Sequence, residues 1–597
     1  MNRGHAAGRG SGEPGPRVWG GPRPAVARIE AKIGGKLAPS IESWPCGTDG
    51  ELGLVGGAAA MAIERWNPRS DYTKQEDRIL RRLRKTRKLF AFLRDHRHEL
   101  FDDAFQAELE AMYRSTGAGK DPTPPALLAM VVLLQSYQGT SDAEAVDLTV
   151  MDLRWQMVLD RLGADEPAFA QGTLVGFRDR LIRSDMDLRL LERTVELARR
   201  TNAFDWRKLP KTLRVAVDSS PLVGAGRVED TINLLAHAAR KVVDCAAVLL
   251  EWTADRVARE AGIPLLLESS VKRALDIEWA DPDAKADALN TLIRQLDHLD
   301  AWLRQRLPAE VGKPPLKQHV DTLIQLRTQD LEPDPDGGGG KTRIREGVAA
   351  DRRVSVEDGD MRHGRKSKTK LFNGYKRHIA VDLDTDLTVA CAVTPANRPE
   401  EEAAPDLKAD IERQGRAIWE LYIDRGYIAS PVVGEVLAAG GQVICKPWVP
   451  HNGTRFTKAD FKINMRAMTI TCPAGEVEPI DLGADVEFNP QACARCTMRK
   501  DCTTAAAGHG RKVSIADDER LQHRLRKLVS TPLGRARLRE RVAVEHRLAH
   551  LGRRQGPRAR YRGTRKNLFD VRRAAAIQNL EVLDRRLTPD VAVRAAA

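Results

Sequence analysis

Two different periodicities of apolar residues divide the chain. From residue 72 to residue 205 apolar positions recur every three or four residues, which predicts a domain made of helices. Gly139 and Thr140 separate two of these helices, and Ser141 is the expected N-cap of the second. Residues 1–60 are rich in Gly, Pro and Ala without clear periodicity, so we expect a disordered arm, with Met61 as an alternative start.

After residue 210 the apolar pattern changes to a period of two. LRVAVD (213–218) predicts a short strand, and KRHIAVDLDT with LTVACAVTP predicts a hairpin that turns near Thr385 and Asp386. PEEEAAPDLKADIERQ and SPVVGEVLAAG are typical of helices, whereas LYID and QVICKP are typical of strands. The expected order is therefore strand, hairpin, helix, strand, helix, strand.

Two segments interrupt this alternating region. Residues 228–340 return to helical periodicity and end in the linker EPDPDGGGGKTR, so we predict a helical insertion there. Residues 448–530 contain four cysteines and are predicted to form a small cysteine-rich insertion. The sequence thus predicts an α/β domain over residues 210–597 that carries both insertions and follows the helical domain 72–205.

Two of the predicted strands end on an acidic residue, Asp218 and Asp424. An unpaired carboxylate is costly inside a core, so each strand is expected to deliver its acid to an edge or a cleft. Taken alone, an Asp after a strand is more often a turn former or an N-cap, and that interpretation stays open. The order of elements nevertheless resembles the RNase H-like mixed-sheet core, in which acids at the ends of the first and fourth strands lie side by side.

A third carboxylate is expected from a later helix. Two neighbouring carboxylates repel each other, and a bridging divalent cation removes that penalty, as two-metal polynucleotidyl transfer requires. Glu545 is the candidate, because it shares a helical face with Arg541 in RLRERVAVEHRLAHLGRR. Apolar packing of this helix is expected from Val542, Val544, Leu548 and Leu551. An Arg541–Glu545 pair within the helix is the alternative interpretation.

Charge then narrows the class of partner. With 42% hydrophobic residues the chain is expected to be globular. Lys and Arg exceed Asp and Glu by 13, which favours a polyanionic partner such as nucleic acid, and a charge that only keeps the protein in solution is the alternative interpretation. Residues 535–573 hold fourteen Lys and Arg against three acids. No apolar run approaches the roughly 20 residues of a membrane span, and the start lacks a secretory signal. We therefore predict a cytoplasmic, nucleoid-associated protein without a membrane partner.

Two basic stretches are candidates for binding double-stranded DNA. The first, MRHGRKSKTKLFNGYKRH (361–378), mixes basic and aromatic residues just before a strand, and a solvated loop is its alternative interpretation. The second spans the late helix and RYRGTRKN. The predicted DNA-binding residues are Lys368, Lys370, Tyr375, Lys376, Arg541, Arg553, Arg562, Arg565 and Lys566.

Four of the eight cysteines lie within a short stretch of the chain. They are Cys472, Cys493, Cys496 and Cys502. A Cys-x-x-Cys pair is able to hold one side of a tetrahedral Zn²⁺, so a structural zinc site is one prediction, and free thiols are the other.

Several ordered motifs together resemble one family, the DDE-type transposases of bacterial insertion sequences. They are PPALLAMVVLL with TSDAEA, DLRWQMVL and TLVGFRDRL, then VAVDSSPLVGAGRVEDT, KTKLFNGYKRHIAVD with VTPAN, YIDRGY, RVAVEHRL and YRGTRKN. The resemblance covers roughly residues 72 to 582. It implies a DNA transposase in which Asp218, Asp424 and Glu545 bind Mg²⁺ (or Mn²⁺), cut at terminal inverted repeats, and join the 3′ ends to target DNA. It also implies a homodimer in the DNA complex.

The sequence departs from one helix signature of this family. The signature has Tyr three residues before the Arg and Lys seven after the Glu, where this chain has Leu538 and Gly552. The departure leaves open whether a DNA hairpin forms, and Arg553 is a partial substitute for the lysine. Two alternatives also stay open: an RNase H-like nuclease without strand transfer, and a catalytically silent DNA-binding protein derived from a transposase.

Overall fold

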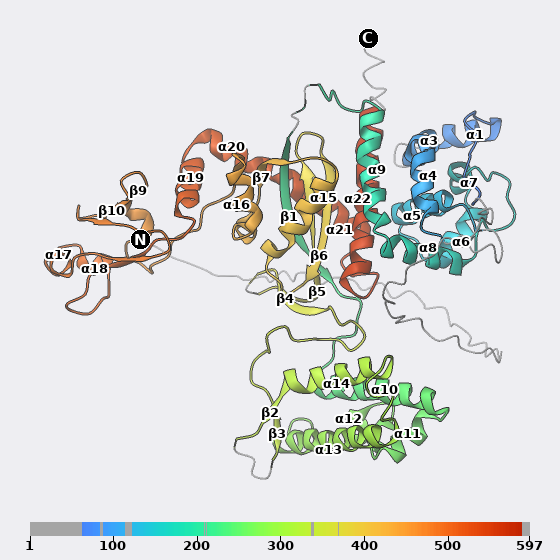
Figure 1. The fold of residues 1–597 in the computed structure, drawn as a ribbon, viewed down its shortest axis with the longest axis horizontal. Coiled ribbons are helices and arrows are strands. Elements are labelled where there is room, and N and C mark those ends of the chain that lie inside the picture. Colours follow the sequence, from blue (N-terminus) through green and yellow to red (C-terminus); the bar gives the residue numbers. More distant parts are fainter. Residues whose placement is uncertain are drawn as a thin grey trace, which may run out of the picture. The chain divides into compact units, whose positions relative to one another are not determined.

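The computed structural model describes residues 63–83, 88–113, 122–207, 209, 212–335, 340–367 and 369–587. The predicted disordered arm over residues 1–60 and the alternative start at Met61 lie outside these ranges. The described chain is a mixed α/β protein with many helices and a mixed sheet (Figure 1). None of the described helices is long and apolar enough to span a membrane.

The described residues between Lys74 and Arg200 are mostly helical, as the periodicity predicts. Helix α5 begins on Pro125 and ends where Gly139 adopts a left-handed φ of +77°. The predicted N-cap Ser141 is confirmed, because its hydroxyl accepts the N–H of Glu144 and the Glu144 carboxylate accepts the N–H of Ser141. The helices are α1 (Lys74–Arg82), α2 (Leu89–Asp95), α3 (Arg97–Leu100), α4 (Asp103–Glu110), α5 (Pro125–Gln138), α6 (Asp142–Met151), α7 (Leu153–Leu159), α8 (Gln171–Arg183) and α9 (Met186–Arg200).

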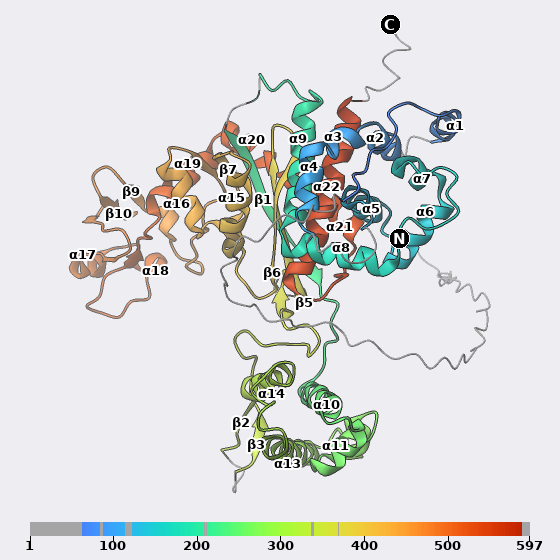
Figure 2. The same cartoon turned by 45° about the vertical axis from the view of Figure 1, so that its right-hand side comes forward.

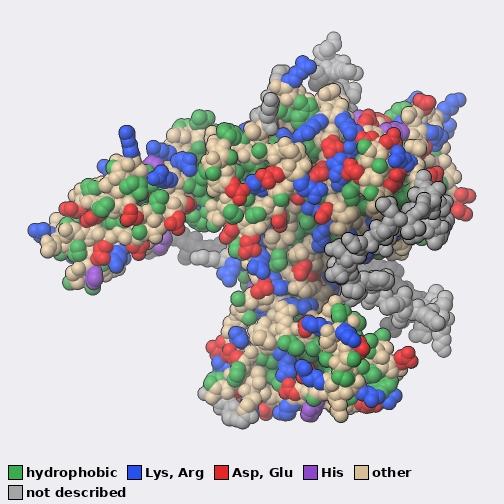
Figure 3. All heavy atoms as spheres, in the orientation of Figure 1, with side chains coloured by type: hydrophobic (Ala, Val, Ile, Leu, Met, Phe, Trp, Pro, Cys, Tyr) green, Lys and Arg blue, Asp and Glu red, His purple; other side chains and the backbone are tan. Residues whose placement is uncertain are grey.

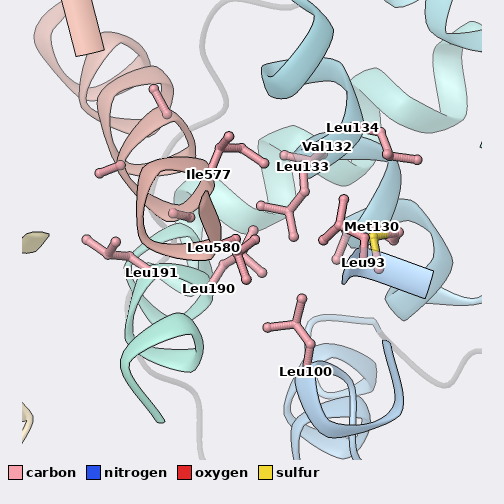
Figure 4. Packing of buried hydrophobic residues seen from close by; sticks show 14 of the residues in the cluster. Leu93, Leu100, Met130, Val132, Leu133, Leu134, Leu190, Leu191, Ile577 and Leu580 are labelled. Atoms are coloured by element: carbon pink, nitrogen blue, oxygen red, sulfur yellow. The ribbon is translucent and has the colours of Figure 1, made fainter. Parts of the chain in front are cut away.

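Helix α22 (Thr564–Leu587) joins these helices to the sheet. It lies beside α9 in both ribbon views and contacts α5, α9 and strand β6 (Leu387–Pro395) (Figure 1 and Figure 2). Leu190 of α9, Leu133 of α5 and Leu580 of α22 belong to one buried apolar cluster, drawn in Figure 4. Helix α5 is buried from Pro125 to Ser136, which explains why its sequence is apolar on every side.

The main sheet is mixed and has six described strands. They are β1 (Leu213–Val223), β4 (Arg362–Arg365), β5 (Leu371–Asp382), β6 (Leu387–Pro395), β7 (Ile418–Tyr422) and β8 (Gln442–Ile444). Strand β5 pairs antiparallel with β4, β6 and β1, while β7 pairs parallel with both β1 and β8. The predicted hairpin is confirmed as β5 and β6, with Asp386 at a φ of +62° in its turn.

Alternating residues of β1 face two different helical layers. Val215 and Val217 pack in one cluster with residues of α15 (Ala404–Arg413) and α16 (Pro431–Ala438). Ala216 belongs to the other cluster, which includes residues of α21 (Val542–Gln555) and α22. Because side chains alternate along a strand, Asp218 lies on the α21 side.

Strand β1 is longer than predicted, which corrects the expectation that it ends at Asp218. Its pairing with β7 stops at Ala216, but its pairing with β5 continues to Val223 opposite Gly374. The residues SSPLV read as a loop because Ser and Pro are poor strand formers. The ladder with β5 overrides that local preference, so Asp218 lies inside β1, just beyond the last residue paired with β7.

The remaining elements lie between and after the strands. Residues 231–344 contain α10 (Thr231–Leu250), α11 (Ala254–Glu260), η2 (Pro264–Leu266), α12 (Val271–Leu275), α13 (Pro282–Arg306), α14 (Leu316–Asp330), β2 (Leu331–Pro333) and β3 (Thr342–Ile344). Three short 3₁₀ helices are η3 (Glu400–Ala403), η4 (Arg425–Tyr427) and η5 (Lys458–Asp460). The later elements are β9 (Lys462–Asn464), β10 (Thr469–Thr471), β11 (Val477–Pro479), β12 (Asp485–Glu487), α17 (Pro490–Arg495), α18 (Arg499–Cys502), β13 (Lys512–Ser514), α19 (Glu519–Ser530) and α20 (Pro532–Glu540). The segments 231–331 and 456–515 each contribute a separate apolar cluster.

Candidate active site

Asp424 occupies the turn that follows β7. Its Oδ1 accepts the backbone N–H of Gly426 at 2.9 Å, so it is the N-cap of η4. Ala216 of β1 pairs with Tyr422 of β7 in parallel register, and each acid lies two residues further along the chain, Asp218 still within β1 and Asp424 just after β7. Asp218 and Asp424 therefore reach the same end of this strand pair. The N-cap interpretation and the cleft interpretation of Asp424 are both correct in this structure.

Glu545 lies in the first turn of α21, four residues after Arg541. The Arg541 guanidinium bridges two acids, with Nη1 3.3 Å from Asp218 Oδ2 and Nη2 2.5 Å from Glu545 Oε1. The alternative prediction, an ion pair within the helix, is thus present, and the same arginine also reaches β1.

The apolar face of α21 differs in one residue from the prediction. Val544, Leu548 and Leu551 are buried, whereas Val542 is 40% exposed. Two residues along a helix differ by about 200° in direction, so Val542 points away from the face that Val544 shares with Leu548. This face packs α21 against the sheet, and Arg541 links its Glu545 to Asp218 of β1.

A cleft of about 990 Å³ is lined by all three predicted acids. Asp218, Asp424 and Glu545 contribute from β1, the turn after β7, and α21. Six basic side chains also line this cleft: Arg365, Lys366, Lys370, Lys376, Arg377 and Arg553. On the face drawn in Figure 3, by contrast, Lys and Arg are interspersed with Asp and Glu. The cleft therefore combines carboxylates that suit a cation with cations that suit a polyanion.

Electrostatics within the cleft favour an added positive charge. Burial raises the pKa of Asp218 to about 6, and the charges of Asp424 and Glu545 act in the same direction, although Arg541 opposes them. Carboxylate oxygens are the ligands that Mg²⁺ and Mn²⁺ prefer, so these three acids fit a divalent cation by chemical type. Within the described ranges no three His, Cys, Asp or Glu side chains are already gathered into a metal-binding group.

Only some of the predicted DNA-binding residues of the 361–378 stretch line the cleft. Lys370 and Lys376 line the cleft, whereas Lys368 lies outside the described residues. Tyr375 is fully buried, where its hydroxyl donates to Asp358 at 2.5 Å and accepts the N–H of Gly563 at 3.0 Å. Tyr375 thus joins β5 to the chain before α22 and does not line the cleft.

Likewise, only some of the predicted DNA-binding residues of the late basic stretch lie at the cleft. Arg541 and Arg553 are at the cleft, Arg541 through its ion pair with Asp218 and Arg553 in the lining. Arg562 pairs with Glu357 at 2.5 Å, and Arg565 donates to Asp187 at 2.6 Å. Lys566 is exposed at the start of α22. DNA contact by Arg562, Arg565 and Lys566 stays a prediction. The ion pairs of Arg562 with Glu357 and of Arg565 with Asp187 also stabilise the fold.

The four clustered cysteines line a second cavity, of about 400 Å³. Cys472, Cys493, Cys496 and Cys502 are free and half-buried. Burial raises the pKa of Cys502, and the neighbouring thiols raise it further, while Arg511 opposes them. Although the thiols face a common space, no three of them form a metal-binding group in the described chain. The described residues thus show no ready-made zinc site, and the choice between a structural zinc and free thiols stays a prediction.

One acid of the cleft was missed by the sequence analysis. Glu400 lines it from η3, and its Oε1 accepts the hydroxyl of Ser219 at 2.5 Å. A Cβ added to Gly426 would lie 2.3 Å from Glu400 Oε2, so the absence of a side chain at 426 leaves room for this carboxylate. Glu400 thus contacts the residue after Asp218 and approaches the turn after Asp424. The run of three Glu in PEEEAAP carries no local signal that would select it.

Comparison with known protein families matches two segments of the chain. Residues 342–580 match the transposase DDE domain family, and residues 79–180 match a transposase domain family, DUF772. The first segment includes Asp424 and Glu545, whereas Asp218 lies between the two segments. No curated protein and no solved structure matched the chain. Both matched families are transposase families, and together they cover more than half of the sequence. The chain therefore belongs to the DDE-type transposases of insertion sequences, which are polynucleotidyl transferases.

Proposed function

We propose that this transposase cuts at the terminal inverted repeats of its insertion sequence and joins the released 3′ ends to target DNA. One observation carries the proposal: acids from β1, the turn after β7, and α21 line a single cleft together with six basic side chains. Phosphoryl transfer needs charge stabilisation at the reacting phosphate and a grip on the neighbouring backbone. The cleft offers residues of both kinds.

We assign the sheet and its helices to an RNase H-like core. The strand sequence β6-β5-β1-β7-β8, antiparallel in its first half and parallel in its second, supports this assignment. The catalytic domain then spans residues 210–597, with a helical insertion at 228–340 and a second insertion at 448–530. The helices of residues 72–205 form a DNA-binding domain in this proposal.

Asp218, Asp424 and Glu545 hold the divalent ions in this proposal, with Mg²⁺ as the usual metal and Mn²⁺ as its substitute. When bound, such ions activate the attacking oxygen and stabilise the leaving oxygen of a phosphodiester. Arg541 contacts the carboxylates of both Asp218 and Glu545 through its two ion pairs. Its positive charge also reduces their repulsion while no metal is bound.

A joining assay tests the proposed function. The full chain is mixed with Mg²⁺, a linear DNA that carries the inverted repeats flanking its gene, and a target plasmid. We expect new 3′ ends at the repeat boundaries and products in which these ends are joined to the plasmid. Cleavage without joined products would favour the nuclease alternative, and DNA binding without either product would favour the silent DNA-binding protein. A transposase that cuts two ends together is expected to act as a homodimer on DNA.

The lysines of the cleft are expected to set the salt dependence of DNA binding. Replacing both Lys370 and Lys376 with Ala removes two cations from the lining. The slope of log K against log salt is negative, and each lost phosphate contact reduces its magnitude by about 0.9. The slope of the double variant should therefore be smaller in magnitude than that of the wild type by up to about 1.8. Fluorescence anisotropy with labelled end DNA at several salt concentrations measures this slope.

A matched double variant controls for net charge. Lys285 and Lys317 are lysines of α13 and α14 that do not line the cleft. Replacing both with Ala removes the same charge and should leave the slope close to that of the wild type. An equal loss in the two double variants would mean that only overall charge matters, and the cleft would then not be the DNA-binding surface.

A further inference from the structure

Arg377 of β5 is a buried cation whose hydrogen bonds go to neutral groups. It is 5% exposed, and its Nε donates to Ser220 Oγ at 2.8 Å. Its Nη1 donates to Gln555 Oε1 at 2.7 Å and to the carbonyl of Gly556 at 3.3 Å. Asp570 is the acid whose charge favours the guanidinium, but Gln555 lies between them and Asp570 is itself paired with Arg573. Arg377 therefore lacks a carboxylate of its own among the described residues.

Other buried arginines on this side of the sheet have carboxylate partners. Arg547 of α21 pairs with Asp386, and Arg572 of α22 pairs with Asp187 at 3.2 Å. A buried charge without a counter-charge is unfavourable, and burial lowers the pKa of Arg377 to about 10. The free protein thus holds Arg377 at an energetic cost that a bound anion would remove.

The register of the sheet places Arg377 beside the catalytic acids. Ser220 faces Arg377 across the β1–β5 ladder, and Asp218 faces Ile379. Arg377 is therefore the diagonal neighbour of Asp218 on the same face, at a distance of about 7–8 Å between backbones. Both residues line the cleft, as does Gly552 of α21, whose position also leaves room for Arg377. A Cβ on Gly552 would lie 2.8 Å from Arg377 Nη2.

We propose that Arg377 binds a backbone phosphate of the DNA strand in the cleft, next to the phosphodiester that reacts at the three acids. A phosphate supplies the missing negative charge, and the planar guanidinium presents N–H donors that match phosphate oxygens. Ser220 and Gln555 hold the guanidinium in place before DNA arrives, so little conformational freedom is lost on binding. This proposal rests on the proposed function, because it requires DNA in the cleft.

The test compares Arg377→Gln and Arg377→Lys with the wild type in binding to end DNA, without divalent ions and at several salt concentrations. We expect Arg377→Gln to bind roughly tenfold more weakly at about 0.15 M salt. The magnitude of its slope of log K against log salt should fall by about 0.9. Arg377→Lys keeps the charge but not the planar fork of donors, so its slope should stay near that of the wild type while its affinity falls. A folded Arg377→Gln with wild-type affinity and slope would overturn the proposal.

A second variant keeps the test valid if Arg377→Gln fails to fold. Gly552→Ala introduces the Cβ that meets Arg377 Nη2 and displaces the guanidinium without changing the net charge. It should weaken DNA binding and reduce the slope, and unchanged binding would again overturn the proposal. Arg547→Gln is the matched control, since it removes a buried but ion-paired arginine of α21; its slope should equal that of the wild type. If the wild type itself fails to bind end DNA, the proposed function fails and not merely the role of Arg377.

Discussion

Replacing Asp424 with Asn is expected to reduce DNA cleavage and joining by about 10³-fold or more while the protein stays folded. The side chain of Asn keeps an oxygen that caps η4 by accepting the N–H of Gly426, but it lacks the charge that a divalent ion needs. Losing the cap altogether, as in Asp424→Ala, costs only about 0.5–2 kcal/mol of stability. Activity should therefore fall far more than stability in both variants.

The rate of cleavage of end-labelled DNA under single-turnover conditions measures this effect. Asp218→Asn and Glu545→Gln should show losses of similar size, because the three acids act as one unit whose effects do not add. Glu402→Gln is the control, an exposed acid of η3 that does not line the cleft. If Asp424→Asn cut DNA at the wild-type rate, the reaction would have to take place elsewhere in the protein.

Local periodicity was sufficient to predict the hairpin of β5 and β6 and the capped start of α6, because turn and cap residues act over a few positions. It was insufficient at β1. Ser219, Ser220 and Pro221 favour a loop by themselves, and only their pairing with a strand more than 150 residues later makes them a strand. Tertiary pairing overrode local preference at the position next to Asp218.

The same distinction separates the parts of the site that the sequence predicted from those it missed. Asp218, Asp424 and Glu545 each stood out as a single acid in an apolar or helical setting, and the structure brings them into one cleft. Glu400 and Arg377 lie in runs of like residues, EEE and KRH, where nothing local selects one member. Their contacts with Ser219 and Gln555 depend on residues 181 and 178 positions away. Such contacts follow from strand register and helix packing, which a single sequence does not specify.

A second large effect is expected in the buried ion-pair network of α22. Arg572 is 7% exposed in its side chain and lies 3.2 Å from Asp187 of α9 and 3.4 Å from Asp410 of α15. Arg572→Met keeps most of the volume but leaves the buried carboxylate of Asp410 without its ion-pair partner, while Asp187 keeps only Arg565. Breaking a buried ion pair in this way costs about 3–5 kcal/mol, so the midpoint of thermal unfolding should fall by several degrees.

This loss of stability should depend on pH, with a sign that follows from Asp410. Burial raises the pKa of Asp410 to about 6 even though Arg572 opposes the shift, so removing Arg572 should raise it further. A carboxyl group whose folded pKa exceeds its unfolded value of about 3.9 contributes stability below the unfolded pKa, and loses that contribution as the pH rises through the folded pKa. Arg572→Met should therefore lose more stability relative to the wild type at pH 8 than at pH 5, as thermal unfolding at the two pH values would measure.

Adding Asp410→Asn to this variant should recover part of the stability at pH 8, because an amide carries no charge to bury. Equal losses at pH 5 and pH 8, with no recovery in the double variant, would mean that Arg572 stabilises α22 through packing and not through its charge.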